Sequence, residues 1–427
     1  MMSTQEYLTA SQVADYLKSK GVFKENAVLE VRDLHAVKES IDGFVNLIYH
    51  VRDENGKSVV LKQIVNLPRS RTEEEAKYGE SEDRGDWTLD IGRMRVEISV
   101  LIFWNSIARG ICPDIYLFDE AQNVIVMEDL TDLSLLRYDL CRMKKNDRFA
   151  EQVGRFFARN LFFSSDLHLT SYKRRKLLNF FANPEYTALE TFLFERCVIV
   201  SNERTMPEAT WAFRRRVIKN ARVQERIERL HRKFSVSKEC LIHTDLHASN
   251  IMVGADKVKI IDTEFAGFGP IAQDMGRLMA SLCLNFISWL VPDKAHSEGE
   301  RSIFRAWLLD ALEALVGHFE AEFRRLVKKY RSESYAVRSL DVDAYLTEHL
   351  QDAVSYAALN AASRISDRGL CHDIARLAPE DRVYPSLLVL KLASDLLEAP
   401  EKYSKISDLS DYLRVLAFRN PREAFNL

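Results

Sequence analysis

A change of periodicity partway along the chain limits the folds open to this sequence. Up to about residue 127, short apolar runs with strand character alternate with turn residues. Over 146–236 and 271–420, apolar residues instead recur every three or four positions, as in amphipathic helices. One island, 239–262, returns to short apolar strands. The pattern predicts an α+β protein with two lobes, the first built on a sheet and the second mostly helical.

The N-terminal part is expected to hold an antiparallel sheet of five strands with one helix, and a further helix is expected ahead of these strands. Ser11 is the expected N-cap of the first helix and Gly21 its stop signal, and the second helix is expected to begin near Leu89. An Asp-Glu-Asn-Gly turn predicts that the second and third strands form a hairpin. Residues 66–88 are charged and almost free of aliphatic side chains, which predicts a long exposed loop. The expected strands are Ala27–Val31, Gly43–Val51, Ser58–Val65, Ile115–Phe118 and Val124–Met127.

Composition excludes several classes of protein. A net charge of −3 gives no reason to expect nucleic acid or an anionic membrane as a partner. No apolar run is long enough to span a bilayer, and the polar N-terminus lacks the apolar core of a signal peptide. The six cysteines are scattered, without a CxxC pair, so free thiols are expected rather than disulfides or zinc. We therefore expect a cytoplasmic protein.

The segment His243-Thr244-Asp245-Leu246-His247-Ala248-Ser249-Asn250 carries the strongest chemical signal. An apolar run precedes it, and a short apolar hairpin follows and leads to Asp262-Thr263-Glu264. An aspartate, an asparagine five residues later and an acidic residue twelve beyond that have the spacing of a kinase-type catalytic loop and metal hairpin. A lone His-x-Asp is also found in ordinary turns, but the other two positions favour phosphoryl transfer.

Each polar residue of this segment has an expected role in that reaction. Asp245 is placed to accept a hydrogen bond from an acceptor hydroxyl and to take its proton. Asn250 and Asp262 offer oxygen atoms of the kind that Mg²⁺ prefers, and Glu264 is expected on the same side as Asp262 if the strand continues. Two histidines have less certain roles. His243 is expected to brace the loop or pack beneath it, and His247 either contacts the site or lies on the surface.

The expected nucleotide half of the site lies upstream. Lys62 stands among aliphatic residues in a strand, where a lysine must reach solvent or find an anion such as a nucleotide phosphate. Glu97, on the following helix, is its expected salt-bridge partner. Asn46 follows the turn that starts the second strand and is best placed to reach the nucleotide, although this turn has one glycine rather than three. Glu128, Asp129 and Leu130 form a connector whose backbone can contact an adenine edge. An alternative for Lys62 is an ordinary surface lysine.

These motifs resemble the aminoglycoside phosphotransferase/choline kinase group of protein-kinase-like enzymes. The finer resemblance is to the methylthioribose kinase family, and it covers most of residues 27–300. It rests on the segments Ile41–Tyr49, Met127–Leu130, Gly154–Leu167 and Asp262–Asp274. The resemblance implies a nucleotide-binding lobe over 1–127 and a catalytic, substrate-binding lobe over 128–427, with the connector at 128–131.

The resemblance also implies an activity: ATP-dependent phosphorylation of the 1-hydroxyl of 5-methylthioribose in methionine salvage. Trp87 resembles the tryptophan of a loop that closes beside the sugar, and the alternative is that it only anchors its own loop. Asp274 is expected to hydrogen-bond the catalytic loop from below. Asn46, Lys62 and Glu128–Leu130 would hold ATP, Asp262 and Glu264 the metal, and Asp245 the sugar hydroxyl.

The sequence departs from the family in three places. One arginine, Arg364, stands where the family has an Arg-Arg pair, His-Gly-Asp is replaced by His-Thr-Asp, and the loop at 66–88 is unusually charged. These departures leave open a kinase of another small alcohol, such as a 5-deoxysugar, an aminoglycoside or an amino alcohol. A catalytically dead pseudokinase is disfavoured because Lys62, Asp245 and Asp262 are all present. The expected partners are a small sugar, with His247, Arg364 and Trp87 as contacts, and a second copy of the chain in a homodimer.

Overall fold

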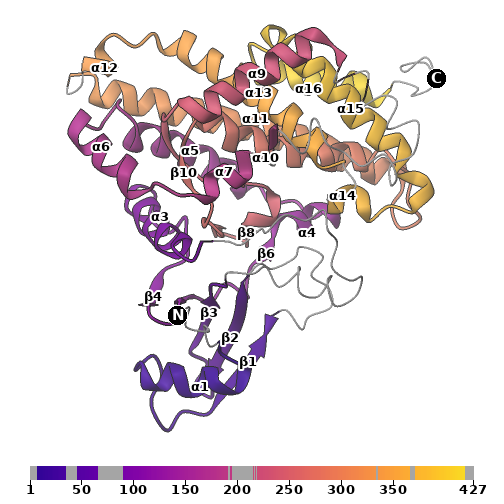
Figure 1. The fold of residues 1–427 in the computed structure, drawn as a ribbon. Helices are drawn as coiled ribbons and strands as arrows, with labels where there is room; N and C mark the ends of the chain where they lie inside the picture. The colour runs from indigo at the N-terminus through magenta and orange to yellow at the C-terminus, as the bar shows by residue number, and fades with distance from the viewer. Residues whose placement is uncertain are drawn as a thin grey trace. The chain divides into compact units, whose positions relative to one another are not determined.

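The computed structural model confirms the α+β class (Figure 1). It describes residues 7–34, 46–65, 90–190, 193–194, 215, 217, 219–332, 335–365 and 371–418. Trp87 and the charged loop at 66–88 lie outside these residues. The chain divides into two compact units, one of residues 1–133 with 259–264 and the other of 134–258 with 265–427. The expected boundary at Met127–Glu128 stays a prediction.

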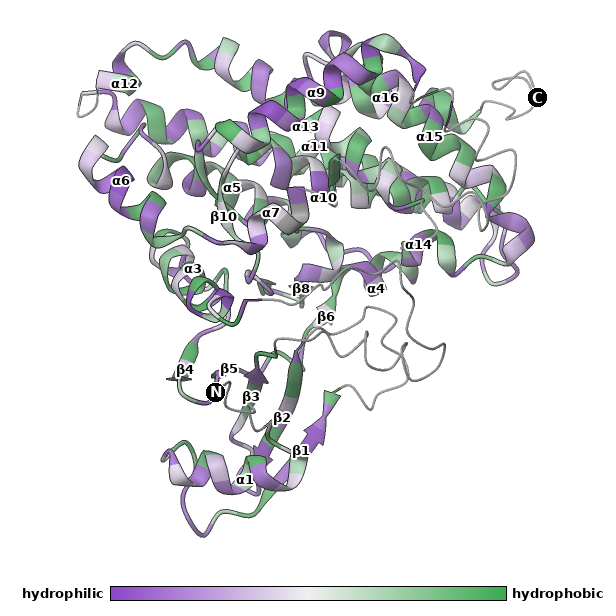
Figure 2. Cartoon of the chain, in the orientation of Figure 1, coloured by the Kyte–Doolittle hydropathy of each residue, from purple (hydrophilic) through white to green (hydrophobic). Residues whose placement is uncertain are grey.

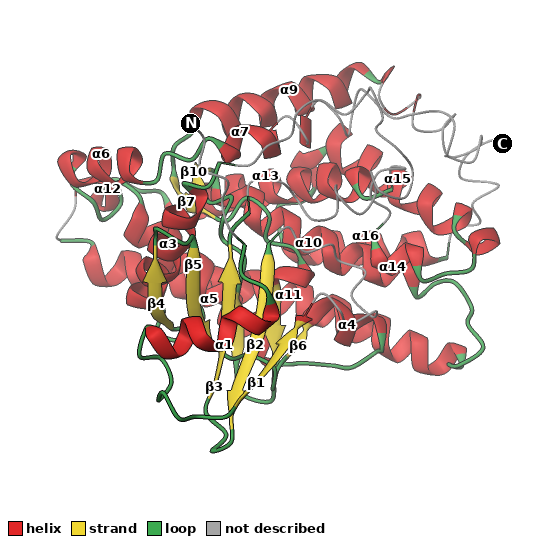
Figure 3. Cartoon of the chain, turned by 60° about the horizontal axis from the view of Figure 1, so that its bottom comes forward, coloured by secondary structure: helices red, strands yellow, loops and turns green. Residues whose placement is uncertain are grey.

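The first unit is built on an antiparallel sheet of five strands in the order β1-β2-β3-β5-β4 (Figure 3). The predicted hairpin is present between β2 and β3, where Gly56 takes a φ of +87° that favours glycine. Each of the five strands ends within two residues of its predicted C-terminal end. The elements are α1 (Ala10–Ser19), β1 (Leu29–Asp33), β2 (Leu47–Asp53), β3 (Ser58–Gln63), α3 (Arg93–Ile107), β4 (Ile115–Asp119) and β5 (Val124–Glu128).

Strand alternation divides this sheet into two apolar faces. Val59 and Leu61 of β3 pack with Val13 and Leu17 of α1 in one buried cluster. The opposite face holds a second cluster with α3, which includes Ile98 and residues of β5. Lys62 follows Leu61, so its side chain points to the face that α3 covers. This alternation is the reason why the strand lysine meets a glutamate on that helix.

The two helix starts differ from their predictions. The N-cap of α1 is Thr9 rather than Ser11, because the side chain of Gln12 accepts a hydrogen bond from the Thr9 backbone N–H (2.8 Å) and completes a capping box. Helix α3 begins at Arg93 rather than near Leu89. The residues just before it form a turn in which the Asp90 carboxylate accepts from the Gly92 N–H (2.5 Å).

The second unit is mostly helical. Its short strands pair as two antiparallel ladders, β6 with β8 and β10 with β7. Figure 2 shows α15 mostly in the hydrophobic colour and α9 mostly in the hydrophilic colour. Every residue of α10 is buried. The strands are β6 (Ser134–Leu135), β7 (Cys240–Ile242), β8 (Ile251–Val253), β9 (Val258–Ile260), which runs into the first unit, and β10 (Gly267–Gly269). The helices are α4 (Leu136–Cys141), α5 (Arg148–Ser164), α6 (Ser171–Phe180), α7 (Glu185–Glu190), α9 (Ala221–Val236), η3 (Ala248–Asn250), α10 (Ile271–Ser288), α11 (Glu298–Tyr330), α12 (Tyr335–Arg338), α13 (Val342–Ser363), α14 (His372–Ala375), η4 (Pro379–Asp381), α15 (Val383–Glu398), η5 (Pro400–Lys402) and α16 (Ile406–Ala417).

Two expectations from composition can be compared with this structure. Among the described residues, no helix is both long and apolar enough to cross a membrane. The cysteines at 112, 141, 240, 283 and 371 are free thiols, as expected, whereas Cys197 lies outside the described residues.

A close helix crossing in the second unit depends on Gly154. A Cβ at this position of α5 would collide with the carbonyl oxygen of Leu315 in α11. We expect Gly154→Ala to lower the free energy of unfolding by about 1–3 kcal/mol through overpacking. The control is Gly317→Ala in α11, where a Cβ would meet nothing within 4 Å. That change should stabilise the protein by about 0.5–1 kcal/mol. Equal effects in urea denaturation would contradict the packing role of Gly154.

Candidate active site

Lys62 lies at the centre of a buried ion-pair cluster in the first unit. Its Nζ is 2.8 Å from Glu97 Oε1 and 2.8 Å from Asp262 Oδ1. Burial alone would lower the pKa of Lys62, but the charges of Asp262, Glu97 and Glu264 outweigh it and raise the pKa. Burial raises the pKa of Glu97, and the charge of Lys62 opposes this shift. The expected partnership of Lys62 and Glu97 is therefore present, and Lys62 stays a cation suited to bind phosphate.

Asp262 and Glu264 have different surroundings although only one residue separates them. The Asp262 side chain is 38% exposed, and its backbone has a φ of +63°, a region that aspartate enters more readily than most residues. Glu264 is 0% exposed, and its Oε2 accepts from Arg93 Nε (2.9 Å) and Asn46 Nδ2 (2.9 Å). Arg93 also donates to Asn46 Oδ1 (2.9 Å). Glu264 thus has a buried ion pair in place of the open carboxylate expected for a metal ligand, and Asn46 takes part in the same cluster.

The side chains of the connector are also held by protein groups. Glu128 Oε2 is 2.7 Å from Lys259 Nζ, and Asp129 Oδ2 is 3.0 Å from His50 Nε2. Leu130 is buried. These contacts occupy the two carboxylates of the connector, and the expected contact of its backbone with an adenine stays a prediction.

The catalytic loop of the second unit has a strained backbone at Thr244. Its φ is +72°, a region that β-branched residues rarely enter, and glycine occupies this place in the usual His-Gly-Asp. The Thr244 hydroxyl donates to the carbonyl of Phe265 (3.0 Å), and the Thr244 N–H donates to Asp274 Oδ1 (2.8 Å). Asp274 Oδ2 also accepts from the N–H of buried His243 (2.7 Å), so Asp274 holds the loop from below as predicted. Burial raises the pKa of Asp274 to about 6, against the opposing effect of these donors.

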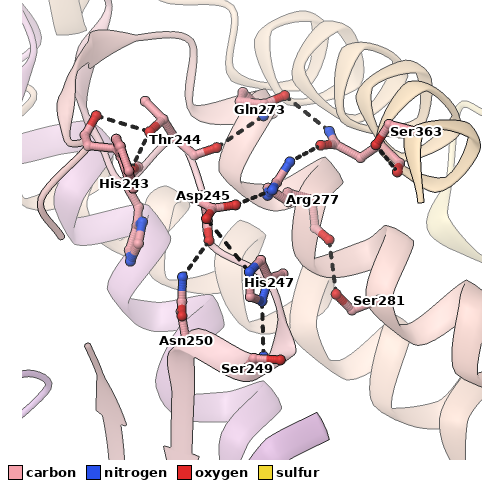
Figure 4. Close-up of polar contacts among 12 residues, drawn as sticks. His243, Thr244, Asp245, His247, Ser249, Asn250, Gln273, Arg277, Ser281 and Ser363 are labelled. Atoms are coloured by element: carbon pink, nitrogen blue, oxygen red, sulfur yellow. Dashed lines mark hydrogen bonds and ion pairs between the residues drawn. The ribbon is translucent and has the colours of Figure 1, made fainter. Parts of the chain in front are cut away.

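Asp245 is held by side chains from both directions (Figure 4). Asn250 Nδ2 donates to the Asp245 carbonyl (2.9 Å), which leaves the amide oxygen of Asn250 as its acceptor. Arg277 Nη2 forms an ion pair with Asp245 Oδ1. Arg277 Nη1 donates to Asn360 Oδ1 (2.7 Å), Asn360 Nδ2 to Gln273 Oε1 (3.2 Å), and Gln273 Nε2 to the carbonyl of Thr244 (3.2 Å). This network links the carboxylate and the backbone of the loop to helices α10 and α13.

His247 lies beside Asp245 rather than on the open surface. Its Nδ1 accepts from the Ser249 N–H (3.1 Å), so the neutral ring carries its proton on Nε2, which is 3.7 Å from Asp245 Oδ2. Burial, followed by the charges of Arg364, Arg137 and Arg277, lowers the pKa of His247 well below its ordinary value. His247 is therefore a neutral hydrogen-bonding group beside Asp245 and not a surface residue, and its contact with a substrate stays a prediction.

The lowered pKa of His247 predicts a pH dependence of stability. As the pH falls below about 6.5, the unfolded chain binds a proton at His247 and the folded chain does not, so stability is lost. His247→Gln should remove up to about 1.4 kcal/mol per pH unit of this slope between pH 6.5 and 5. The control is His349→Gln. Burial opposes protonation of His349, but Glu239 outweighs it and raises the pKa, so its contribution is lost as the pH rises. The free energy of unfolding would be measured at each pH by urea denaturation. The same dependence on pH in wild type and His247→Gln would contradict this account.

Several residues of the site escaped the sequence analysis. Arg93 and Arg277 are the most important of them. Arg277 precedes an apolar run in α10, and a buried charge in such a segment is a signal because it requires a partner. Arg93 stands near Arg95 and Glu97 in α3, so its sequence context carries no comparable signal. Arg364, which was predicted, lies at the C-cap of α13 and lines the same small cavity as His247 and Arg277.

The family assignment rests on a match between this chain and a family model, and the matched residues include most of those described above. Residues 38–315 match the model of the phosphotransferase enzyme family. The chain belongs to that family. It is an ATP-dependent small-molecule kinase that phosphorylates a hydroxyl group. The phosphotransferase is 29% identical over 423 residues to a methylthioribose kinase of Bacillus velezensis, with 97% of this chain and 98% of the relative covered.

A second methylthioribose kinase is also similar to this chain. A methylthioribose kinase of Geobacillus kaustophilus is 29% identical to this chain over 379 residues. The alignment covers 87% of this chain and 86% of that relative. Among solved structures, a glucosamine kinase matches with 13% identity and a TM-score of 0.45, over 83% of this chain and 92% of that one. The resemblance to the methylthioribose kinases and their wider kinase group is confirmed.

Proposed function

We propose that this phosphotransferase transfers the γ-phosphoryl group of ATP to the 1-hydroxyl of 5-methylthioribose, a step of methionine salvage. The main support is similarity over nearly the whole chain to proteins named methylthioribose kinase. Asp245 orients the acceptor hydroxyl and takes its proton, and the links through Arg277 and Asn250 fix its position. Lys62 contacts the nucleotide phosphates, and its pairing with Glu97 holds its Nζ in place.

Mg²⁺ is the metal expected for this reaction. The half-exposed carboxylate of Asp262 and the amide oxygen of Asn250 are hard oxygen donors of the kind that it prefers. Glu264 would serve as a ligand only through Oε1, because its Oε2 accepts from Arg93 and Asn46 and its side chain is 0% exposed. When bound, the metal neutralises charge on the phosphates. The expected homodimer and the cytoplasmic location stay predictions.

The charge around Asp245 favours a sugar over a cationic acceptor. Three arginines, Arg137, Arg277 and Arg364, line the cavity beside it. A choline-like or aminoglycoside acceptor carries positive charge and would be repelled there, whereas sugar hydroxyls can accept hydrogen bonds from guanidinium groups. This observation ranks 5-methylthioribose and related 5-deoxysugars above amino alcohols and aminoglycosides.

A panel of acceptors tests the proposal. ADP release would be measured with 5-methylthioribose, 5-deoxyribose, ribose, choline and an aminoglycoside at equal concentrations. We expect the highest kcat/KM with 5-methylthioribose, a lower value with 5-deoxyribose, and negligible turnover of choline and the aminoglycoside. Preferential turnover of either cation would reject the proposed acceptor and retain the kinase assignment.

A further inference from the structure

Lys259 is a buried lysine of β9 with no part so far in the proposed reaction. Its side chain is 7% exposed, and its Nζ is 2.7 Å from Glu128 Oε2, the first carboxylate of the connector. The same Nζ donates to the carbonyl of Cys112 (3.1 Å). Lysine is rarely buried in proteins unless its charge has a partner. All three residues belong to the first unit, so this contact is internal to that unit.

The turn that leads into β4 contacts the connector as well. The Glu128 N–H donates to the Asp114 carbonyl (2.8 Å), and the Asp114 N–H donates to Glu128 Oε2 (3.2 Å). Asn105 of α3 also holds this turn, since its Oδ1 accepts from the Cys112 N–H (2.9 Å). Glu128 is therefore fixed through its backbone and its carboxylate, and Lys259 joins that carboxylate to the turn.

The strand β9 has a second attachment that does not depend on the Lys259 side chain. The Ile260 N–H donates to the Ile111 carbonyl (2.7 Å) and so holds β9 against the same turn. Asp262 follows two residues later, and its Oδ1 is 2.8 Å from Lys62 Nζ. Loss of the Lys259 ammonium group would therefore release the connector more than the pair of Lys62 and Asp262.

An ion pair at this place restricts the connector in a way that apolar packing would not. The ammonium group of Lys259 must face both oxygen atoms at hydrogen-bond distance, whereas contacts between apolar groups have no preferred direction. A buried ion pair adds little net stability compared with apolar side chains of similar size, because both charges lose their hydration. The best-attested use of such groups is to specify one arrangement of the elements that they join. The geometry at Glu128 fits that use.

We propose that Lys259 is a positioning residue for the adenine base of ATP. Through Glu128 it holds the connector in one arrangement, so that the backbone of residues 128–130 presents its hydrogen-bonding groups to the base at a fixed place. Lys259 itself does not touch the nucleotide. This role rests on the proposed function, because it requires ATP as the donor, but it is independent of the acceptor.

Adenosine and inorganic tripolyphosphate carry the two halves of ATP separately, and their binding tests this role without turnover. Each compound would displace a fluorescent ATP analogue from the full chain. In Lys259→Met, the dissociation constant of adenosine should rise about tenfold, because a hydrogen bond between the connector and the base is no longer aligned. The dissociation constant of tripolyphosphate should stay near the wild-type value. Lys62→Met should have the opposite effect on the two compounds.

Steady-state kinetics provide a second measurement. Lys259→Met should raise the KM for ATP about tenfold and leave kcat near the wild-type value, because the base is bound equally in the ground state and in the transition state. The KM for the acceptor should not change. Lys257→Met is the matched control, since Lys257 stands two residues earlier on the same hairpin and is exposed. That variant should bind both compounds as wild type does.

Three results would overturn the proposal. They are unchanged adenosine affinity in folded Lys259→Met, an equal loss of affinity for adenosine and tripolyphosphate in that variant, and binding of tripolyphosphate but not adenosine by wild type. If Lys259→Met does not fold, the double variant Lys259→Met/Glu128→Gln leaves no unpaired charge and should show the same loss of adenosine affinity. Normal adenosine affinity in the double variant would also reject the role. Failure of every acceptor to turn over would reject the proposed function, while the adenosine measurement would still decide the role of Lys259.

Discussion

Replacing Asp245 with asparagine should lower kcat by about two to four orders of magnitude. This is the usual contribution of a positioned general base, and asparagine cannot take the proton of the acceptor hydroxyl. Its amide oxygen can still accept from Arg277, so the loop should keep its conformation. The residues proposed to hold ATP, such as Lys62, are unchanged, and the dissociation constant of a fluorescent ATP analogue should stay near the wild-type value. Stopped-flow or coupled ADP-release assays would measure the loss of turnover.

Asp256→Asn is the matched control for this variant. Asp256 lies between β8 and β9 with its side chain 85% exposed, and the same chemical change there should leave kcat near the wild-type value. Thermal unfolding of both variants would show whether each is folded at the assay temperature. Near-normal turnover by folded Asp245→Asn would remove Asp245 from the chemical step and leave it with a structural role only.

Replacing Arg93 with glutamine should lower the free energy of unfolding by about 3–5 kcal/mol. Arg93 and Glu264 are both 0% exposed, and loss of the cation leaves an uncompensated buried carboxylate. Arg93 also donates to the Val65 carbonyl (2.6 Å), so a buried backbone acceptor loses its partner as well. Urea denaturation monitored by tryptophan fluorescence would measure the effect, and Trp104 in α3 is a buried reporter in the same unit.

The next arginine on the same helix provides the control. Arg95 forms an ion pair with Glu120, but its side chain is 67% exposed, and such surface pairs contribute at most about 1 kcal/mol. Arg95→Gln should therefore have little effect. The double variant Arg93→Gln/Glu264→Gln should cost less than the sum of its single changes, because each single change leaves one buried charge unpaired and the double change leaves none. Additive costs would show that Arg93 and Glu264 stabilise the unit independently.

Local patterns were enough to predict the elements of the first unit and part of its polar cluster. Alternation along β3 places Lys62 on the face opposite to Val59 and Leu61, and that face is covered by the helix that carries Glu97. Predictions of this kind succeed because side-chain direction in a strand follows directly from residue number. The N-cap at Thr9 was missed because the glutamine that completes its capping box was not considered.

The roles of Glu264 and Arg277 depend on contacts between distant parts of the chain. Asp262 and Glu264 look equivalent in the sequence, yet Arg93, 171 positions before Glu264, binds Glu264 in a buried ion pair. Arg277 is one of two charged residues, with Asp274, in the mostly apolar α10. Only the packing of α10 against α13 brings it to Asn360, and only the position of the loop brings it to Asp245. The spacing of charged residues along the sequence does not indicate which of them will form buried ion pairs with one another.

The offsets between Asp245, Asn250 and Asp262 were enough to predict the reaction class, and periodicity was enough to predict the order of strands and helices. Both are local properties of the chain, because short offsets within one loop or strand constrain geometry directly. The tertiary structure alone decided which carboxylate is buried in an ion pair and which is open. It also decided that Arg137, Arg277 and Arg364 gather at one cavity. The physical reason is that the electrostatic environment of a charged group depends on burial and on neighbours that folding brings together from remote positions.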